Sequence, residues 1–196
     1  MIRRVLDGPR VEPSEPLRPA LVDLAAHLSS ELQRRHIEHA LIGGMAVAVL
    51  KVPRATEDLD LLIPIEREAD VHALMVSEGY EVLQRTENVS NYLRGSARVD
   101  FLHAVRAYAR AMLVNARDLD VGRLRLRVVQ PEDLIGLKVQ ATSNDPKRWR
   151  DLDDIQRLLR AHAGSLDMDR VREYFRIFDR EAELDAILQD LPGSPR

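Results

Sequence analysis

The stretch Leu41-Ile-Gly-Gly-Met-Ala-Val-Ala-Val-Leu50 and the stretch Asp58-Leu-Asp-Leu-Leu-Ile63 decide the fold of this chain. An apolar run over 37–42 ends abruptly at the two glycines, which predicts a short strand. A short apolar helix over 45–51 should follow, because Pro53 cannot continue it. The second stretch predicts another strand, over 57–63. Two strands joined through a Gly-Gly turn and one short helix therefore form the expected centre of the molecule.

The second of these strands carries two acidic residues, Asp58 and Asp60, with Leu59 between them. Side chains alternate along a strand, so both carboxylates should emerge on one face while Leu59 points into the core. Neighbouring carboxylates repel each other, and a cation would relieve the repulsion. Mg²⁺ suits such a site because it prefers oxygen ligands and keeps substrate phosphates in its shell. An isolated Asp-x-Asp is nevertheless more often a pair of solvated acids.

Two further features extend this pattern. Gly43 and Gly44 allow positive φ and leave room for a ligand against the backbone, and the helix that follows would point free N–H groups at a phosphate. Asp100 lies in a third apolar strand, predicted over 97–103. Beside the first two acids it would complete a cluster of three carboxylates that can hold two metal ions. Alternatively, the glycines only form a tight turn and Asp100 only ends a strand.

Strands and helices mix in the first two thirds of the chain, and the last third is helical. The other expected helices span 19–36, 65–79, 105–118, 131–142, 148–162, 167–179 and 181–191, and the other expected strands span 80–85, 91–95 and 124–129. Four prolines up to Pro19 predict an extended N-terminal arm. We therefore divide the chain into the arm (1–18), a mixed core (19–130) and a helical lobe (131–196).

The helical lobe contributes three charged residues of interest. Lys138 lies in a mostly apolar helix and could meet phosphate oxygens as a point charge. Asp151 and Asp154 are three positions apart and so share one helix face. The plainer interpretation is a lysine whose aliphatic stem reaches along the helix to solvent, with two ordinary surface acids.

Composition limits the classes of protein that the chain can belong to. The 196 residues are 45% hydrophobic and 31% charged, which suits a packed globular core. The chain has no cysteine, so disulfides, cysteine-bound zinc and thiol nucleophiles are excluded. The N-terminus lacks the apolar stretch of a signal peptide, and no run approaches the ~20 apolar residues of a membrane span. We expect a soluble, cytoplasmic protein without a membrane partner.

A formal net charge of −3 gives no general electrostatic attraction to nucleic acid. Two local stretches could still form a basic patch, although a solvated surface is the plainer interpretation. They comprise Arg123, Arg125 and Arg127, and Lys147, Arg148 and Arg150. The lone Trp149 is expected to be a packing anchor rather than a platform on which bases stack.

In combination, these motifs are more specific than each one alone. The run Gly43-Gly44-x13-Asp58-Leu59-Asp60, with Arg54 and Thr56 just before the acids, resembles the signature of the DNA-polymerase-β-like nucleotidyltransferase superfamily. The later runs Pro131-Glu-Asp-Leu-Ile-Gly-Leu-Lys138 and Arg150-Asp-Leu-Asp-Asp-Ile155 resemble its AbiEii-type toxin branch. The resemblance covers residues 30–160, and its Gly-Gly/Asp-x-Asp part is the more specific.

This resemblance implies an α+β fold with a mixed β-sheet, flanking helices and a C-terminal helical lobe. It implies that an NMP is moved from an NTP, such as ATP, to a tRNA, protein or small-molecule acceptor, with two Mg²⁺ ions. The roles it implies are metal ligation by Asp58, Asp60 and Asp100; nucleotide binding by Gly43, Gly44, Arg54, Thr56, Lys138 and Asp154; and a charged pair in the catalytic machinery, Lys138 with Asp151. A toxin of this branch would also have a cognate antitoxin as partner.

Three alternatives stay open at this point. The chain is short for a full toxin of this type, which leaves room for a catalytically inactive, nucleotide-binding or regulatory member of the same fold. Drug-modifying nucleotidyltransferases, such as the lincosamide-modifying enzymes, resemble the same Gly-Gly and Asp-x-Asp run. In the third alternative, the chain is a plain α/β domain whose acids are solvated.

Overall fold

The computed structural model describes residues 10–11, 17–122 and 124–190. Most of the expected N-terminal arm (1–9 and 12–16), Arg123 and the tail 191–196 lie outside this part. By its contacts the chain divides into two units, Met1–Val129 and Gln130–Arg196.

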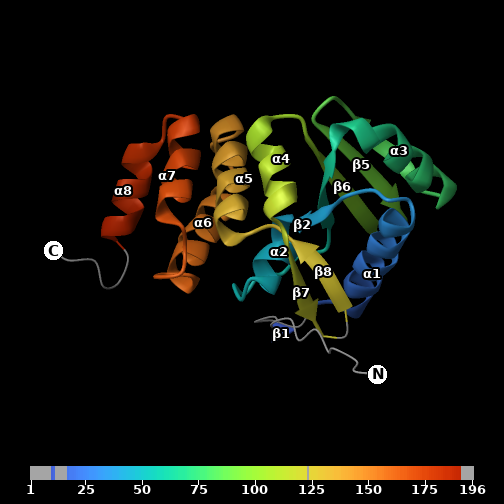
Figure 1. Ribbon diagram of the computed structural model, residues 1–196, viewed down its shortest axis with the longest axis horizontal. Coiled ribbons are helices and arrows are strands. Elements are labelled where there is room, and N and C mark those ends of the chain that lie inside the picture. The colour runs from blue at the N-terminus through green and yellow to red at the C-terminus, as the bar shows by residue number, and fades with distance from the viewer. Residues whose placement is uncertain (1–9, 12–16, 123, 191–196) are drawn as a thin grey trace, which may run out of the picture. The chain divides into compact units, whose positions relative to one another are not determined.

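The first unit is built on a sheet whose described strands follow the order β1-β7-β8-β2-β3-β6-β5-β4. The strands are β1 (Arg10–Val11), β2 (Ala40–Ile42), β3 (Leu59–Pro64), β4 (Glu81–Arg85), β5 (Val89–Arg94), β6 (Ala97–Ala104), β7 (Arg117–Val121) and β8 (Leu124–Val128) (Figure 1). Parallel and antiparallel pairs both occur in it, so the sheet is mixed and the fold is α+β.

Helices connect these strands. They are α1 (Pro19–Arg34), α2 (Gly43–Val49), the 3₁₀ turn η1 (Ile65–Arg67), α3 (Glu68–Ser77) and α4 (Ala107–Asn115). Pro19 suits the first position of α1, because its missing N–H would have no partner within the helix. The segment expected as one helix over 65–79 begins instead with η1, directly after Pro64 ends β3.

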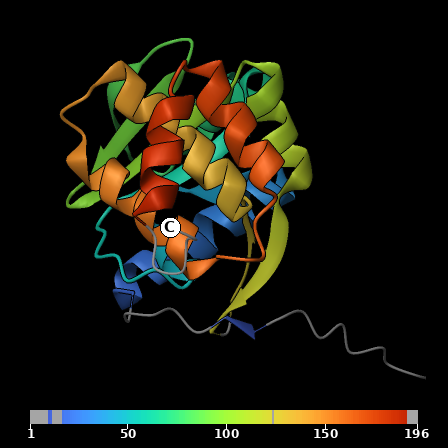
Figure 2. The ribbon, with the colours of Figure 1, turned by 90° about the vertical axis from the view of Figure 1, so that its left-hand side faces the viewer.

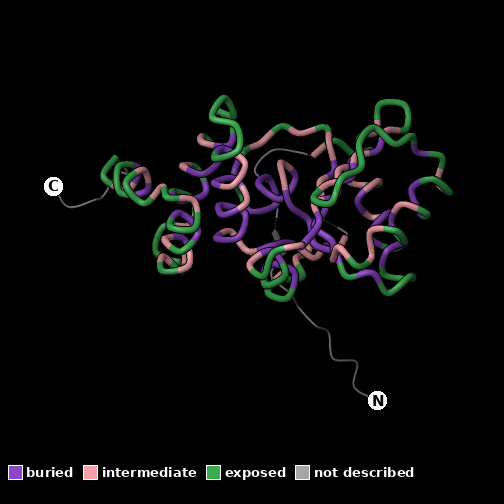
Figure 3. Tube along the Cα trace, turned by 90° about the horizontal axis from the view of Figure 1, so that it is seen from above, coloured by how far each residue is buried: buried purple, intermediate pink, exposed green. Residues whose placement is uncertain are grey.

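At the centre of the sheet an apolar row stands on one face, and the acids stand on the other, which also carries the buried Leu62. Leu59 and Leu61 of β3 and Phe101 of β6 lie on one face and are at most 4% exposed. Figure 3 shows buried residues concentrated along the inner strands and exposed residues at the loops and outer helix faces. Burying such side chains stabilises a fold by about 1.5–3 kcal/mol each, so this face fixes which way the acids between them must point.

The strand β7 was missed by the sequence prediction, which assigned a helix up to residue 118. The structure ends α4 at Asn115 and then pairs β7 with β8 as an antiparallel hairpin. The sequence of β7, Arg-Asp-Leu-Asp-Val, is mostly charged and half exposed, so it has little apolar alternation to reveal it. The hydrogen bonds of β8 decide its conformation.

The second unit consists of four helices among its described residues: α5 (Pro131–Asn144), α6 (Trp149–Ala161), α7 (Met168–Ile177) and α8 (Glu181–Gln189). Figure 2 shows α7 and α8 running alongside one another. Asp167 caps α7 by accepting a hydrogen bond from the Arg170 N–H. Gly136 of α5 faces the ring of Tyr174, and a Cβ there would meet that ring at 2.6 Å. In neither unit do the described residues form a helix long and apolar enough to span a membrane.

Candidate active site

The Gly-Gly turn joins β2 to α2 and packs directly against the Asp-Leu-Asp strand. Gly43 has a φ of +67°, and a Cβ built on it would lie 1.9 Å from Oδ2 of Asp60. A Cβ on Gly44 would lie 2.8 Å from Oγ1 of Thr56. Both positions therefore require glycine, the first for its backbone conformation and both for space. The carboxylate of Asp60 is thus placed at the start of α2.

Asp60 and Asp100 are direct neighbours across the sheet. They are register partners in the parallel pair of β3 with β6, so their side chains emerge on the same face, from strands about 4.8 Å apart. Asp60 also pairs with Ile42 of β2, and Asp100 pairs with Asn91 of β5. The structure therefore aligns Asp60, Asp100 and Asn91 in one row across three strands.

Asp58 lies immediately before β3 and is half-buried. Burial raises the pKa of its carboxyl group; Arg98 opposes this shift, and the charges of Asp100 and Glu57 add to it. Asp58 is therefore close enough to Asp100 for the two charges to interact. The three acids predicted as metal ligands lie in one region of the first unit.

Arg98 is the functional candidate that sequence reasoning missed. It precedes Asp100 by two positions on β6, and its Nε donates to both carboxylate oxygens of Asp100 at 3.1 Å. The pKa of Arg98 is raised by this hydrogen bond and by the charges of Asp100, Asp58 and Asp60. Its i, i+2 spacing from Asp100 was the available signal, since such residues share a strand face. Arg98 is thus the counter-cation of the acidic row.

The chemistry of this row suits a divalent cation, because carboxylate oxygens are the ligands that Mg²⁺ prefers. Asp58, Asp60 and Asp100 would hold it. Among the described residues, however, no three acidic or histidine side chains converge closely enough to enclose an ion. Arg98 instead supplies the positive charge beside Asp100. The acids fit a metal in donor type, and Asp60 and Asp100 share one face, while Arg98 competes for Asp100.

The other predicted nucleotide-binding residues of this unit lie in the segment before β3. Thr56 packs over Gly44 and donates, at 3.4 Å, to the carbonyl oxygen of Asp58. Arg54 donates to the carbonyl oxygen of Ala55 at 3.2 Å and is partly exposed. Thr56 therefore contacts the glycine turn directly, whereas Arg54 bonds within its own loop.

Lys138, Asp151 and Asp154 form a buried cluster within the second unit. The Nζ of Lys138 donates to Asp151 at 2.8 Å and to Asp154 at 2.6 Å. The side chains of all three are at most 10% exposed. Burial raises the pKa of Asp151, but the charges and hydrogen bonds of Lys138 and Arg148 outweigh it and leave that pKa lowered. The surface lysine and surface acids of the plainer interpretation are therefore wrong.

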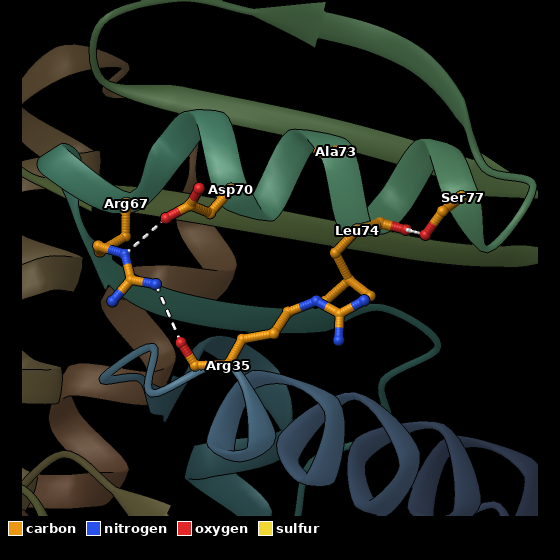
Figure 4. A pocket seen from close by; sticks show the side chains of 6 residues that line it. All are labelled: Arg35, Arg67, Asp70, Ala73, Leu74 and Ser77. Atoms are coloured by element: carbon orange, nitrogen blue, oxygen red, sulfur yellow. Dashed lines mark hydrogen bonds and ion pairs between the residues drawn. The ribbon is translucent and has the colours of Figure 1, made fainter.

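A separate cavity of about 500 Å³ lies in the first unit between α1 and α3. Its lining residues are Arg35, Arg67, Asp70, Ala73, Leu74 and Ser77 (Figure 4). The guanidinium of Arg67 already bonds Asp70 and the backbone oxygens of Arg35 and His36, and Arg35 bonds Glu31. None of the predicted site residues lines this cavity, and its cations are held by protein groups.

The space above Gly43 yields a prediction for Gly43→Ala. We expect the substitution to lower the free energy of unfolding by about 2–4 kcal/mol, because a left-handed residue with a side chain costs about 1–2 kcal/mol and crowding adds a similar amount. The measurement is chemical denaturation followed by circular dichroism.

The matched control is Gly95→Ala. Gly95 has a φ of +61°, but a Cβ there meets no atom within 4 Å, so only the backbone cost of about 1–2 kcal/mol should appear. Equal losses in the two variants would show that Asp60 does not press on the turn.

A model of the family described as "Nucleotidyl transferase of unknown function (DUF2204)" matches residues 21–192. No curated protein is similar enough in sequence to count as a relative.

Several solved structures share the fold. The solution structure of the antibiotic-resistance factor ANT(2'')-Ia has 16% identity and a TM-score of 0.63, over 85% of this chain and 94% of that one. An antigenic nucleotidyltransferase-like protein from Paracoccidioides brasiliensis has 18% identity and a TM-score of 0.56, over 89% and 95%. The lincosamide antibiotic adenylyltransferase LnuA has 12% identity and a TM-score of 0.52, over 74% and 98%. At these identities the similarity establishes the fold alone.

Proposed function

Because the chain belongs to a family of nucleotidyl transferases of unknown function, we propose that it moves a nucleoside monophosphate from an NTP to an acceptor and releases pyrophosphate. One observation carries this proposal: Asp60 packs on Gly43 and stands in register with Asp100. The glycine turn, where the backbone can approach a phosphate, therefore lies beside the acids. Those acids would hold the cation that neutralises the charge of the phosphate.

In this proposal Asp58, Asp60 and Asp100 hold Mg²⁺, which when bound would neutralise phosphate charge and stabilise the leaving pyrophosphate. Gly43 and Gly44 leave the main chain open to the triphosphate, and Thr56 fixes the turn. With seven residues, α2 is short, so its dipole contributes little to phosphate binding. The contribution of the turn is the space that the glycines leave beside the backbone.

For Lys138, Asp151 and Asp154 the resemblance assigns nucleotide handling, and we keep that assignment as a proposal. The buried ion pairs point to a competing role. A lysine that left for a triphosphate would take its charge away from two buried carboxylates, at considerable cost, although Asp151 would keep its pair with Arg148. In the competing role, the cluster holds α5 and α6 together and positions the helical unit.

The direct test is to incubate the protein with each α-labelled NTP, Mg²⁺ and a panel of acceptors. The panel comprises total tRNA, lysate proteins and small antibiotics. The antibiotics belong in it because structures of similar fold include LnuA with lincomycin and ANT(2'')-Ia with adenylyl-2''-tobramycin. The expected result is one labelled acceptor class and stoichiometric pyrophosphate.

The panel also separates the alternatives. Labelled tRNA or protein would support the toxin-like branch, whose antitoxin should then suppress the labelling, and a labelled antibiotic would support a drug-modifying enzyme. Mg²⁺-dependent NTP binding without transfer to any acceptor would contradict the enzyme and leave the inactive, regulatory member of the fold.

The position of Arg98 yields a second prediction. We expect Arg98→Gln to bind Mn²⁺, used as a probe for Mg²⁺, about three- to ten-fold more tightly, because removing a unit charge a few ångströms away is worth on the order of 1 kcal/mol at this partly exposed site. Electron paramagnetic resonance of free Mn²⁺ measures the affinity without any reaction.

The control for this measurement is Arg110→Gln. It removes the same charge from α4, where Arg110 pairs with Glu66 instead of the acidic row. Weaker Mn²⁺ binding by Arg98→Gln than by the wild type would mean that Arg98 assists the cation instead of competing with it.

A further inference from the structure

Trp149 lies on the surface, contrary to the packing anchor expected from the sequence. It is the only tryptophan of the chain and the first residue of α6, and it is 66% exposed. Large aromatic side chains usually bury most of their area, so an exposed one is informative. The amphipathic α6 buries Ile155, Leu158 and Leu159 instead, and Trp149 takes no part in that apolar face.

The residues around Trp149 give this surface a positive charge. Lys147, Arg148 and Arg150 are all exposed, and the guanidinium of Arg150 lies 5.3 Å from the centroid of the indole ring. Asp151 pairs with Arg148 as well as with Lys138, and Asp145 accepts a hydrogen bond from the Lys147 N–H. Lys147 and Arg150 are therefore the cations that a phosphate could reach. We call residues Lys147–Arg150 the Trp149 patch.

We propose that the Trp149 patch binds single-stranded nucleic acid, with one base stacked on the indole ring and the neighbouring phosphates held by the cations. Base–aromatic stacking contributes about 1–3 kcal/mol per base and tolerates any sequence, since every base has a π face. A duplex keeps its bases stacked on each other and would not offer one. One exposed ring with a cation beside it and Lys147 two positions away in the chain therefore favours a strand over a duplex.

A protein partner fits this surface less well. An apolar protein interface needs a contiguous patch of a few hundred Å². The large hydrophobic residues that are exposed in the described part of the second unit are only Trp149 and Ile177, and Ile177 ends a different helix, α7. The Arg150 guanidinium lies near the ring instead, and a cation there is complementary to phosphate.

If the patch holds the acceptor of the transfer reaction, the inference rests on the proposed function, and the acceptor is the end of a polynucleotide. That the patch binds a strand at all does not depend on the proposed function. The patch lies in the helical unit, apart in sequence from the glycine turn and the acidic row. Binding can therefore be measured without any transfer reaction.

The lone tryptophan makes the test specific, because all tryptophan fluorescence comes from the proposed contact. The full chain is titrated with a single-stranded 12-mer of RNA or DNA, with the matching duplex and with ATP. We expect saturable quenching by the strand, little by the duplex or ATP, and an affinity that falls as salt rises.

Variants then identify the contact through the anisotropy of a labelled 12-mer. We expect Trp149→Ala to weaken binding about ten-fold or more, from the loss of one stacked base, and Trp149→Phe to retain affinity within about three-fold. Lys147→Gln should weaken binding and reduce the salt dependence, whereas Arg172→Gln should do neither. This control substitution removes a unit of positive charge from α7, where Arg172 pairs with Asp185.

Three results would overturn the proposal. One is an affinity for the labelled 12-mer, measured by anisotropy, that Trp149→Ala leaves unchanged. Another is equal affinity for the duplex and the single strand. The third is self-association by sedimentation that Trp149→Ala abolishes, which would make the ring a contact between copies. Strand binding that depends on Trp149, in a protein that transfers no nucleotide, would support the patch while contradicting the proposed function.

Discussion

Replacing Asp60 with asparagine is expected to lower the rate of nucleotidyl transfer by about 10³-fold. A metal ligand contributes to several kcal/mol of charge stabilisation in the transition state, and each ~1.4 kcal/mol is a factor of ten in rate. Asparagine keeps the size of the side chain and so should keep the register of β3 with β2 and β6. The measurement is label transfer from α-labelled NTP, with circular dichroism and thermal melting to confirm the fold.

The chain carries its own control for this variant. A second Asp-Leu-Asp occurs at 118–120 on β7, where Asp118 is half exposed and lies 3.4 Å from Arg125. Asp118→Asn should leave transfer unchanged. If Asp60→Asn retained transfer within about three-fold of the wild type, the assignment of Asp60 as a metal ligand would be refuted.

Replacing Lys138 with methionine is expected to destabilise the helical unit by about 3–5 kcal/mol, the usual cost of removing one partner from a buried ion pair. Methionine keeps the length of the side chain, so the change isolates the charge. Asp151 and Asp154 would stay buried without the Lys138 ammonium, and Asp151 would keep its pair with the largely exposed Arg148. Urea denaturation without nucleotide measures the loss.

The control is Arg157→Met on the same helix. Arg157 and Asp153 form a pair 3.0 Å apart whose side chains are 44% and 48% exposed, and such surface pairs contribute only about 0–1 kcal/mol. A Lys138→Met protein of unchanged stability with a raised KM for the NTP would instead assign Lys138 to the triphosphate. The two roles of the cluster therefore give opposite results in two simple measurements.

Much of the fold could be predicted because its signals are local. The glycine turn, the alternation of Asp58, Leu59 and Asp60, and the periodicity of the C-terminal helices each depend on a few adjacent residues. The family match agrees with the resemblance that these motifs carry. The observed boundaries of some elements differ from the predicted ones because residues outside the segment set them. The helix predicted from residue 65, for example, begins with a 3₁₀ turn after Pro64.

The site was less accessible from sequence because its residues meet across strands. Nothing near Asp100 in the chain shows that β6 pairs with β3, and a shift of one residue would have turned its carboxylate to the apolar face. Arg98 bonds Asp100 within β6, but only the pairing with β3 brings the charges of Asp58 and Asp60 near it. The partners of Lys138 likewise come from another helix, 13 and 16 positions away.

The sequence by itself determined the turn, the acidic strand and the helical character of the last third, since backbone sterics and side-chain alternation act over a few residues. Only the tertiary structure decided that Asp100 stands beside Asp60, that Arg98 pairs with Asp100, and that Lys138 is buried while Trp149 is exposed. These outcomes depend on hydrogen bonds and packing between distant segments, whose energies no local pattern contains.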